Sequence, residues 1–426
     1  MLVELKSCGA LIRKNGIALN NLAFADDVVL IAESKDKMKQ LLLICERWSI
    51  QVGMRFSPSK CALISNSEQS GLTIYDQPLP CSAEEKYLGI NINQEGINFV
   101  KLAKERTDKA KGVIATLRNL GMNMSGFSVE ASTRLYKSFI RPVMEYGLQL
   151  SPATPENLRI YQGTQNLALR VIFSAPKTAS INALHKLAII EKIQTRNQVL
   201  NLKFSGNLHN SMDGSIPAVR IWRSAIQSLP KGSLTELSKS NPLWNKGTWS
   251  NHLFNRLGNA QTQPIVLTKK STKEIARKSI IDLDSNASNV AGSITIDSAE
   301  KHRFILKDNN IAKHTRITTT RWLIGIIAMH QPCQNCPDLT ELSRSHAQIC
   351  SGALAYLQTK FEIPLYARSS PLNHLLNSHR HSADHHFYEY IATAIGLIYE
   401  KCLDWCQAAN GFWVPRIRDN AQDTIP

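Results

Sequence analysis

Two adjacent aspartates between apolar runs constrain this chain more than any other feature. They lie in residues 21–32, which read Asn-Leu-Ala-Phe-Ala-Asp-Asp-Val-Val-Leu-Ile-Ala. Apolar runs of this kind favour buried strands, and burial of a lone ionised carboxylate is costly. A tight hairpin resolves the conflict, because it carries both side chains to a turn at the edge of a sheet. The pattern therefore predicts a β-hairpin with Asp26 and Asp27 at its tip.

The two carboxylates are candidate ligands for a divalent cation. Mg²⁺ prefers oxygen ligands, and two such ions can stabilise the attacking and leaving oxygens of a phosphoryl transfer. Asp26 is the expected direct ligand, because it opens the turn. An ordinary Asp-rich turn between strands is the alternative interpretation.

Further motifs follow in a fixed order, and each short motif is weak by itself. Residues 53–61 read Gly-Met-Arg-Phe-Ser-Pro-Ser-Lys-Cys, and residues 85–90 read Glu-Lys-Tyr-Leu-Gly-Ile. Residues 141–147 read Arg-Pro-Val-Met-Glu-Tyr-Gly, and residues 321–325 read Arg-Trp-Leu-Ile-Gly before a Cys/His cluster. Together with Phe-Ala-Asp-Asp, this order resembles the reverse transcriptases of non-LTR (LINE-type) retrotransposons.

The resemblance implies an RNA-directed DNA polymerase that catalyses Mg²⁺-dependent nucleotidyl transfer on a primer–template. It assigns Asp26 and Asp27 to the Mg²⁺ site and places Lys60 near the leaving pyrophosphate, as proton donor or charge stabiliser. A surface lysine at the start of a strand is the alternative for Lys60. The residues that would position the 3′ end of the primer are Lys86, Tyr87, Leu88 and Gly89.

One expected part of the family's site has no counterpart in the sequence. The family carries a further catalytic aspartate on an earlier strand, whereas residues 1–20 contain no Asp and only one acid, Glu4. Asp26 and Asp27 alone are expected to hold Mg²⁺ loosely, because a two-metal centre draws carboxylates from both strands. We therefore interpret the chain as the C-terminal part of a reverse transcriptase, inactive alone.

Three roles stay open for such a chain. It could be a polymerase completed by a missing N-terminal part, on a partner chain or an upstream exon. It could be a non-catalytic nucleic-acid-binding remnant that uses its helices, a basic segment and a zinc knuckle. It could also be a decayed transposon fragment without a role.

The expected fold class is α+β, a partial polymerase palm followed by a mainly α-helical thumb and a small zinc-knuckle region. The palm remainder with its primer grip covers 1–97, the thumb 98–210, a basic linker 211–300 and a helical zinc-knuckle region 301–426. Helices are expected over 35–52, 100–120, 128–146, 153–172 and 180–208, with a final helix from near Tyr388. Strands are expected over 2–12, 17–32, 60–65, 72–75 and 87–92.

The charge suggests polyanionic partners, namely an RNA template and a DNA primer or target. The net charge is +16 and the pI about 9.4, and residues 201–280 hold 12 Lys or Arg against 3 Asp or Glu. Tryptophans interleave there, which suits base stacking, although we favour a solvated linker with a few anchoring tryptophans. A basic stripe on the helix over 100–120 faces either phosphates or solvent: Lys101, Lys104, Arg106, Lys109 and Lys111.

One group of three cysteines and a histidine has metal-ligand spacing. The pattern C-x2-C-x9-H-x3-C predicts a structural Zn²⁺ site, and a chance cluster is the alternative. Its ligands would be Cys333, Cys336, His346 and Cys350. In the family such a knuckle is thought to help bind the element's RNA or its target DNA.

The remaining cysteines and histidines suggest no second site. Cys8, Cys45, Cys61 and Cys81 are expected as small core residues. The histidines between 379 and 386 are expected on the surface, and Cys402 in a buried stripe of the last helix with Trp405 and Cys406.

The sequence suggests an intracellular protein. Nine cysteines, an odd number, argue against a disulfide framework. No secretory signal, membrane span, endonuclease signature or RNase H constellation is evident. The expected location is therefore a reducing compartment, the nucleus or the cytoplasm, with no membrane partner.

Overall fold

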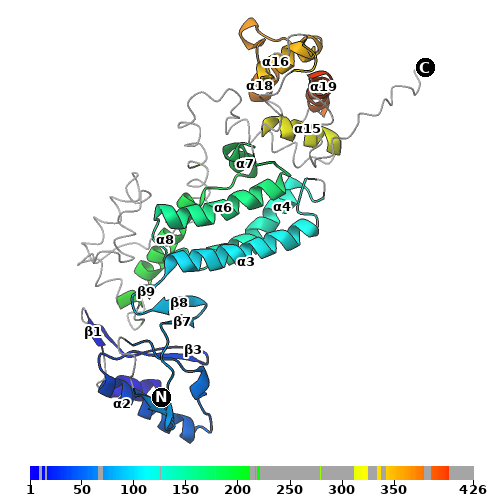
Figure 1. Cartoon of the computed structure of the whole chain (residues 1–426). Coiled ribbons are helices and arrows are strands. Elements are labelled where there is room, and N and C mark those ends of the chain that lie inside the picture. Colours follow the sequence, from blue (N-terminus) through cyan, green and yellow to red (C-terminus); the bar gives the residue numbers. More distant parts are fainter. Residues whose placement is uncertain are drawn as a thin grey trace, which may run out of the picture. The chain divides into compact units, whose positions relative to one another are not determined.

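The structure is a computed structural model of the whole chain (Figure 1). It describes residues 1–8, 12–14, 17–65, 71–124, 126–177, 179–211, 216, 218–220, 279, 311–324, 333–336, 342–378 and 385–402. The chain divides into two compact units, which comprise residues 1–108, 144–161 and 196–272, and residues 109–143, 162–195 and 273–426. Nearly all of the expected basic linker, with its tryptophans, lies outside the described residues.

The N-terminal part begins with a short helix rather than a strand, so the predicted strand over 2–12 is wrong in its first half. Helix α1 spans Leu2–Ser7. Its Leu5 is fully buried against Leu41, Ile44 and Cys45 of a later helix. A helical turn buries Leu5 while Val3 stays in solvent. The short apolar run fits a helix or a strand equally well, and the contact of Leu5 with the later helix selects the helix.

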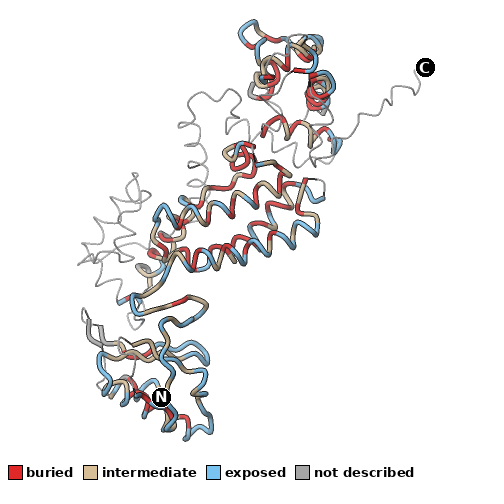
Figure 2. The backbone as a smooth tube through the Cα atoms, in the orientation of Figure 1, coloured by how far each residue is buried: buried red, intermediate tan, exposed pale blue. Residues whose placement is uncertain are grey.

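Two antiparallel hairpins follow α1. Strand β1 (Ile12–Lys14) pairs with β2 (Ile17–Leu19), and β3 (Asn21–Phe24) pairs with β4 (Asp27–Leu30). The predicted strand over 17–32 is thus three strands, β2, β3 and β4, which are separated at Asn20 and at the predicted turn. Figure 2 shows that the β3–β4 region is mostly exposed or half-buried.

Helix α2 (Lys35–Gln51) confirms the first predicted helix. The hydroxyl of its N-cap Ser34 accepts the N–H of Lys37, and Gly53, with a φ of +70°, follows its end. Its apolar face forms two small cores, and Leu30 of β4 packs against both. The hairpin is therefore anchored on α2 through the end of β4.

Short elements connect α2 to the next helices. They are the 3₁₀-helix η1 (Pro58–Lys60) and strands β5 (Thr73–Ile74), β6 (Gln77–Pro78), β7 (Glu84–Tyr87), β8 (Ile90–Asn93) and β9 (Gly96–Ile97). The strand predicted over 60–65 is wrong, because only Leu63 pairs there, in a parallel bridge with Cys81. The strand predicted over 87–92 is interrupted by a turn at Leu88 and Gly89, from which β7 and β8 form a hairpin.

A helical segment follows, largely as predicted. It comprises α3 (Phe99–Asn119), α4 (Val129–Leu135), the π-helical η2 (Tyr136–Ile140), α5 (Arg141–Glu145), α6 (Pro155–Ile172), α7 (Ile181–Ala188) and α8 (Ile193–Asn210). In Figure 2 the buried residues recur along these helices at helical spacing. The single helix predicted over 180–208 is wrong between α7 and α8. Ile189 adopts a left-handed φ of +46° there, and the buried Ile190 carbonyl lies 2.7 Å from Nδ1 of His185.

The C-terminal described part is all helical. Its elements are α15 (Lys313–Leu323), α16 (Arg344–Cys350), α17 (Ala353–Gln358), the 3₁₀-helix η3 (Leu365–Ala367), α18 (Pro371–Ser378) and α19 (His385–Cys402). Helix α19 packs against α15, α16 and α17, with Trp322 and Phe387 fully buried. The predicted last helix is confirmed, as is the burial of Cys402. His379, His381, Trp405 and Cys406 lie outside the described residues.

Helices and small antiparallel sheets together confirm an α+β fold class. Of the four cysteines expected in the core, only Cys45 is buried, whereas Cys8 and Cys61 are half-buried and Cys81 is exposed. No helix among the described residues is long and apolar enough to span a membrane.

Candidate functional sites

The structure forms the β-hairpin that the sequence predicts, although Ala25 rather than Asp26 opens its turn. Phe24 pairs with Asp27, so Ala25 and Asp26 form a two-residue turn. Ala25 has a φ of +52°, in the left-handed region that favours glycine. Asp26 lies in the turn and Asp27 opens β4, and both residues are exposed. The turn thus presents two adjacent carboxylates to solvent.

The base of this hairpin is fixed by a buried asparagine. The amide of Asn20 donates to the carbonyl of Leu5 at 2.5 Å, and Asn20 also receives a hydrogen bond from the side chain of Asn21 at 2.6 Å. The carbonyl of Asn20 accepts the N–H of Ile31 at 2.8 Å. These bonds hold the hairpin on α1 and leave its tip free.

The hairpin tip has little around it in the described part of the chain. Phe24 is 62% exposed, and the side chains of Asp26 and Asp27 form no hydrogen bond or ion pair there. No third carboxylate, imidazole or thiol among the described residues joins them in a potential metal site. Two carboxylates fit the oxygen preference of Mg²⁺ but supply only part of a coordination shell.

Lys60 does not lie at the start of a strand, where the alternative interpretation placed it. It is the last residue of η1, and its N–H donates to the carbonyl of Ser57 at 3.0 Å. Pro58 opens this 3₁₀ turn with its fixed φ. The Lys60 side chain is exposed and makes no ion pair with Asp26 or Asp27 among the described residues.

The four predicted primer-binding residues share one hairpin. Lys86 and Tyr87 end β7, and Leu88 and Gly89 form its turn, with φ values of +48° and +76°. Positive φ at both central positions defines a type I′ turn, which matches the twist of a two-residue hairpin. Lys86 Nζ lies 3.0 Å from Glu105 Oε2 of α3.

The basic stripe predicted on α3 is partly wrong. Lys101 forms an ion pair with Glu84, and Nη2 of Arg106 donates to the carbonyl of Gly89 at 2.5 Å. Arg106 is half-buried and holds the β7–β8 hairpin instead of facing phosphates or solvent. Lys101 pairs with Glu84 and stays exposed, as predicted. Lys104 and Lys109 are exposed as predicted.

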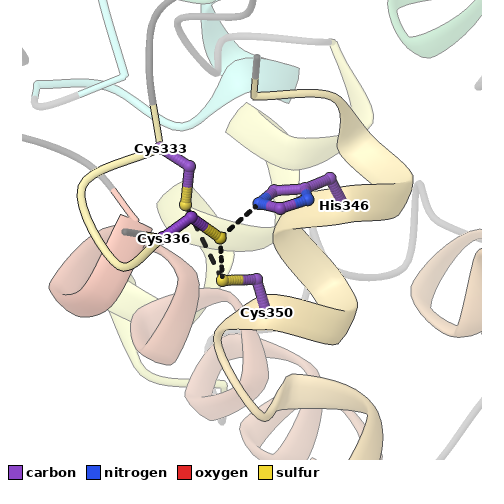
Figure 3. Close-up of side chains that lie close together, drawn as sticks. All are labelled: Cys333, Cys336, His346 and Cys350. Atoms are coloured by element: carbon purple, nitrogen blue, oxygen red, sulfur yellow. Dashed lines mark hydrogen bonds between the residues drawn. The ribbon is translucent and has the colours of Figure 1, made fainter. Parts of the chain in front are cut away.

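The Cys/His residues form the second candidate site (Figure 3). Cys333 and Cys336 lie in one turn, and His346 and Cys350 lie one turn apart on α16, whose N-cap Ser343 accepts the N–H of His346 at 3.0 Å. One potential ligand atom from each of the four residues lies within 4.8 Å of the others. The structure thus brings together all four residues that the spacing selected.

The distances between the ligand atoms suit a small tetrahedral ion. Sγ of Cys350 lies 3.7 Å from Sγ of Cys333 and 3.2 Å from Sγ of Cys336, which lies 3.3 Å from Nε2 of His346. Zn–S bonds of about 2.3 Å at tetrahedral angles imply sulfur–sulfur separations of ~3.7 Å. Three thiols and one imidazole are a donor set that Zn²⁺ favours and Mg²⁺ does not.

Two neighbours of this cluster were not foreseen from the sequence. Nδ2 of Asn335 donates to Cys350, to its carbonyl at 2.9 Å and to its Sγ at 3.2 Å. Burial raises the pKa of Cys350, but hydrogen bonds from Asn335 and the neighbouring thiols outweigh it, so that the pKa is lowered. Burial raises the pKa of Cys402, whose carbonyl accepts the N–H of Gln334 at 3.3 Å. The only sequence signal for these neighbours is that Asn335, which has an amide side chain, directly precedes the predicted ligand Cys336.

Residues 6–92 match the family described as "Reverse transcriptase (RNA-dependent DNA polymerase)". No curated protein matches the chain. The matched stretch contains the aspartate hairpin, Lys60 and the hairpin of the predicted primer-binding residues. It confirms the resemblance to reverse transcriptases and supports nucleic acid as the general class of substrate.

Proposed function

We propose that this chain belongs to an RNA-directed DNA polymerase of non-LTR type, which extends a DNA primer on an RNA template. The observation that carries the proposal is the two-residue turn that exposes Asp26 and Asp27 inside the stretch matching reverse transcriptases. Its partners would be an RNA template and a DNA primer or target, and the basic net charge favours both.

Different residues of the chain would bind the metal, the primer and the leaving pyrophosphate. Asp26 and Asp27 would hold Mg²⁺, which when bound stabilises charge on the attacking and leaving oxygens. The β7–β8 turn would position the primer strand, and Lys60 would place a cation beside the pyrophosphate. A further carboxylate from outside the described residues would complete the Mg²⁺ site.

A non-catalytic nucleic-acid-binding role is the second candidate. It is favoured by the contrast between the two sites: the Cys/His group offers four ligands, whereas the aspartate turn offers two among the described residues. In this role a structural Zn²⁺ would fix the C-terminal helices, and the helical segment and basic residues would contact the nucleic acid. Reduced thiol ligands would place the protein in the nucleus or cytoplasm.

Primer extension separates the two candidates. The full chain is mixed with a DNA primer annealed to an RNA template, Mg²⁺ and deoxynucleotides, and binding is followed in parallel by fluorescence anisotropy. We expect binding that weakens steeply with salt, because phosphate contacts release counterions. Product that disappears in Asp26→Asn and persists in Asp36→Asn, an exposed aspartate on α2, supports the polymerase.

The other outcomes are equally clear. Binding without any product would overturn the polymerase role for this chain acting alone and leave it the second role. Absence of binding at low salt would contradict both candidates.

A further inference from the structure

The turn of the β7–β8 hairpin is held by two side chains that are remote in sequence. The hydroxyl of Tyr146 donates to the carbonyl of Leu88 at 2.6 Å, and Nη2 of Arg106 donates to the carbonyl of Gly89 at 2.5 Å. The partners are 58 and 17 residues apart. Both carbonyls of one two-residue turn are therefore occupied from the same unit of the protein.

The two clamping side chains also contact each other. The guanidinium carbon of Arg106 lies 4.3 Å from the ring centroid of Tyr146, a cation–π distance. The ring fixes the guanidinium plane, and the guanidinium fixes the ring. We call Arg106 and Tyr146 the turn clamp.

Glycines with positive φ lie in the turn and directly after Tyr146, where the packing is close. A Cβ on Gly89, whose φ is +76°, would lie 3.0 Å from Nη2 of Arg106. A Cβ on Gly147, whose φ is +83°, would lie 3.0 Å from Cδ2 of Leu102 on α3. A side chain at Gly89 would therefore press on the guanidinium of Arg106, and one at Gly147 would press on Leu102.

The strands below the turn are fastened to α3 as well. Glu105 accepts hydrogen bonds from Lys86 at 3.0 Å and from Asn91 at 2.6 Å, and these two residues are direct partners in the β7–β8 register. The strands of the hairpin are therefore bonded to α3 independently of the clamp. What the clamp adds is the orientation of the turn itself.

We propose that Arg106 and Tyr146 are positioning residues that orient the Leu88–Gly89 turn for the primer strand. This inference rests on the proposed polymerase function. An anionic backbone is repelled by exposed carbonyls and attracted by N–H groups. With both turn carbonyls bonded to the clamp, the turn offers its N–H edge, and no hydrogen bond from the N–H of Leu88 or Gly89 is found among the described residues. Leu88, which is 37% exposed, would lie beside the sugar or base of the primer.

Tyr146→Phe tests the clamp, because it removes one hydroxyl and keeps the ring beneath Arg106. Tyr366→Phe is the matched control, since Tyr366 is exposed and its hydroxyl makes no hydrogen bond among the described residues. We measure the affinity of the full chain for a recessed DNA primer on an RNA template and for the single-stranded RNA alone. The preference for the recessed primer should fall about threefold to tenfold in Tyr146→Phe only, the range expected for one lost hydrogen bond.

Arg106→Lys separates positioning from simple charge. Lysine keeps the charge but loses the planar donor that both stacks and bonds. A positioning role predicts that Arg106→Lys loses the preference for the recessed primer, and a plain phosphate contact predicts that it keeps this preference. Amide hydrogen exchange at Tyr87 and Ile90, the strand pair that closes the turn, should rise in Tyr146→Phe and in Arg106→Lys, while exchange along α3 stays unchanged.

The failures of the two proposals are distinguishable. A wild-type chain that binds no primer–template overturns the polymerase function and, with it, the primer role of the clamp. A wild-type chain that prefers the recessed primer, with Tyr146→Phe equal to Tyr366→Phe, overturns the clamp alone. Equal weakening for primer–template and single-stranded RNA also overturns it, because a merely structural defect lacks that selectivity.

Discussion

Ala25 is the residue at which the aspartate hairpin departs from ordinary backbone preferences. Two-residue hairpins need a primed turn with positive φ, and at this position glycine is the usual residue. A Cβ in the left-handed region costs roughly 1–2 kcal/mol. Strain of this kind persists where the surrounding structure enforces it, often beside functional groups. Ala25 lies directly before Asp26, which is consistent with a turn selected to present the two carboxylates.

Replacing Ala25 by glycine should relieve this strain. We expect Ala25→Gly to raise the free energy of unfolding of the N-terminal part by about 1 kcal/mol. Ala23→Gly, in the adjacent strand, should lower it by roughly 0.5–1 kcal/mol, because glycine weakens a strand. Urea denaturation of the full chain measures both. Changes of the same sign in the two variants would contradict a strained turn.

His185 is a buried histidine whose two ring nitrogens both face polar partners. Its Nδ1 lies 2.7 Å from the carbonyl of Ile190 and its Nε2 lies 3.2 Å from Gln162. Burial lowers the pKa of His185 to about 4, and the hydrogen bond to Ile190 opposes this shift only in part. Between pH 4 and 6.5 the imidazole is therefore neutral in the folded protein and protonated in the unfolded chain.

Acid should destabilise the fold through His185. Between pH 6.5 and 4 the unfolded state binds more protons at this site, so stability is fully present above pH 6.5 and falls as the pH drops toward 4. The loss is on the order of 3 kcal/mol. His185→Asn keeps a donor for the Ile190 carbonyl and does not titrate. Urea midpoints across this range should slope less in the variant, and parallel slopes would contradict the assignment.

At the scale of elements, two buried ion pairs fasten the helical segment. Glu145 on α5 accepts three hydrogen bonds from Arg196 on α8, between 2.9 and 3.0 Å, in one unit. Arg141 bonds Glu191 at 2.7 Å in the other unit. Burial makes each charge dependent on its partner, because water no longer compensates for a missing one.

Arg196→Met tests the first of these pairs. It leaves Glu145 buried without its bidentate partner, and we expect a loss of about 3–5 kcal/mol in the free energy of unfolding. Arg134→Ala removes an exposed pair with Glu130 one turn away on α4 and should cost less than about 0.5 kcal/mol. Urea denaturation at a fixed pH compares them. Equal costs would mean that water still solvates Glu145.

Local elements were predictable from the sequence, and contacts between distant elements were not. The aspartate hairpin and α2 follow from signals within a few residues, namely the flanking apolar runs, the Ser34 cap and Gly53. The break between α7 and α8 depends on the buried Ile190 and its bond to His185, which local periodicity does not contain. The turn clamp joins residues up to 58 positions apart. Tyr146 and Leu88 each lie in a recognised motif, but the sequence does not show that the two residues bond to each other.

At the scale of the whole molecule, the Cys/His group shows how spacing can predict a site across a long chain. Its four predicted ligands come from a turn and a helix. In each half of the pattern the two ligands are only three or four residues apart, so the sequence alone indicates that they lie together. The last residue of helix α19, Cys402, lies beside this group. Its carbonyl accepts the N–H of Gln334, which lies between the ligands Cys333 and Cys336. A bound metal would therefore hold the last described helix as well as α16.

Zinc should be a folding component of the C-terminal helices. We expect one Zn²⁺ per chain in the purified protein, and Cys350→Ser should lose it, because Cys350 lies close to both Cys333 and Cys336. Elemental analysis measures the zinc, and limited proteolysis reports whether α16–α19 become accessible. Structural zinc in small domains contributes about 10–16 kcal/mol, so its loss should unfold this part.

Two variants distinguish a ligand from a neighbour. Cys81→Ser changes an exposed thiol in the other unit, and Cys402→Ala changes a buried thiol beside the ligands. Both should retain one zinc per chain, although Cys402→Ala should lower the stability of the C-terminal helices by creating a small cavity. A chelator should reproduce the proteolysis pattern of Cys350→Ser in the wild-type chain. Zinc retained in Cys350→Ser, or lost equally in Cys402→Ala, would show that the four ligands are wrongly assigned.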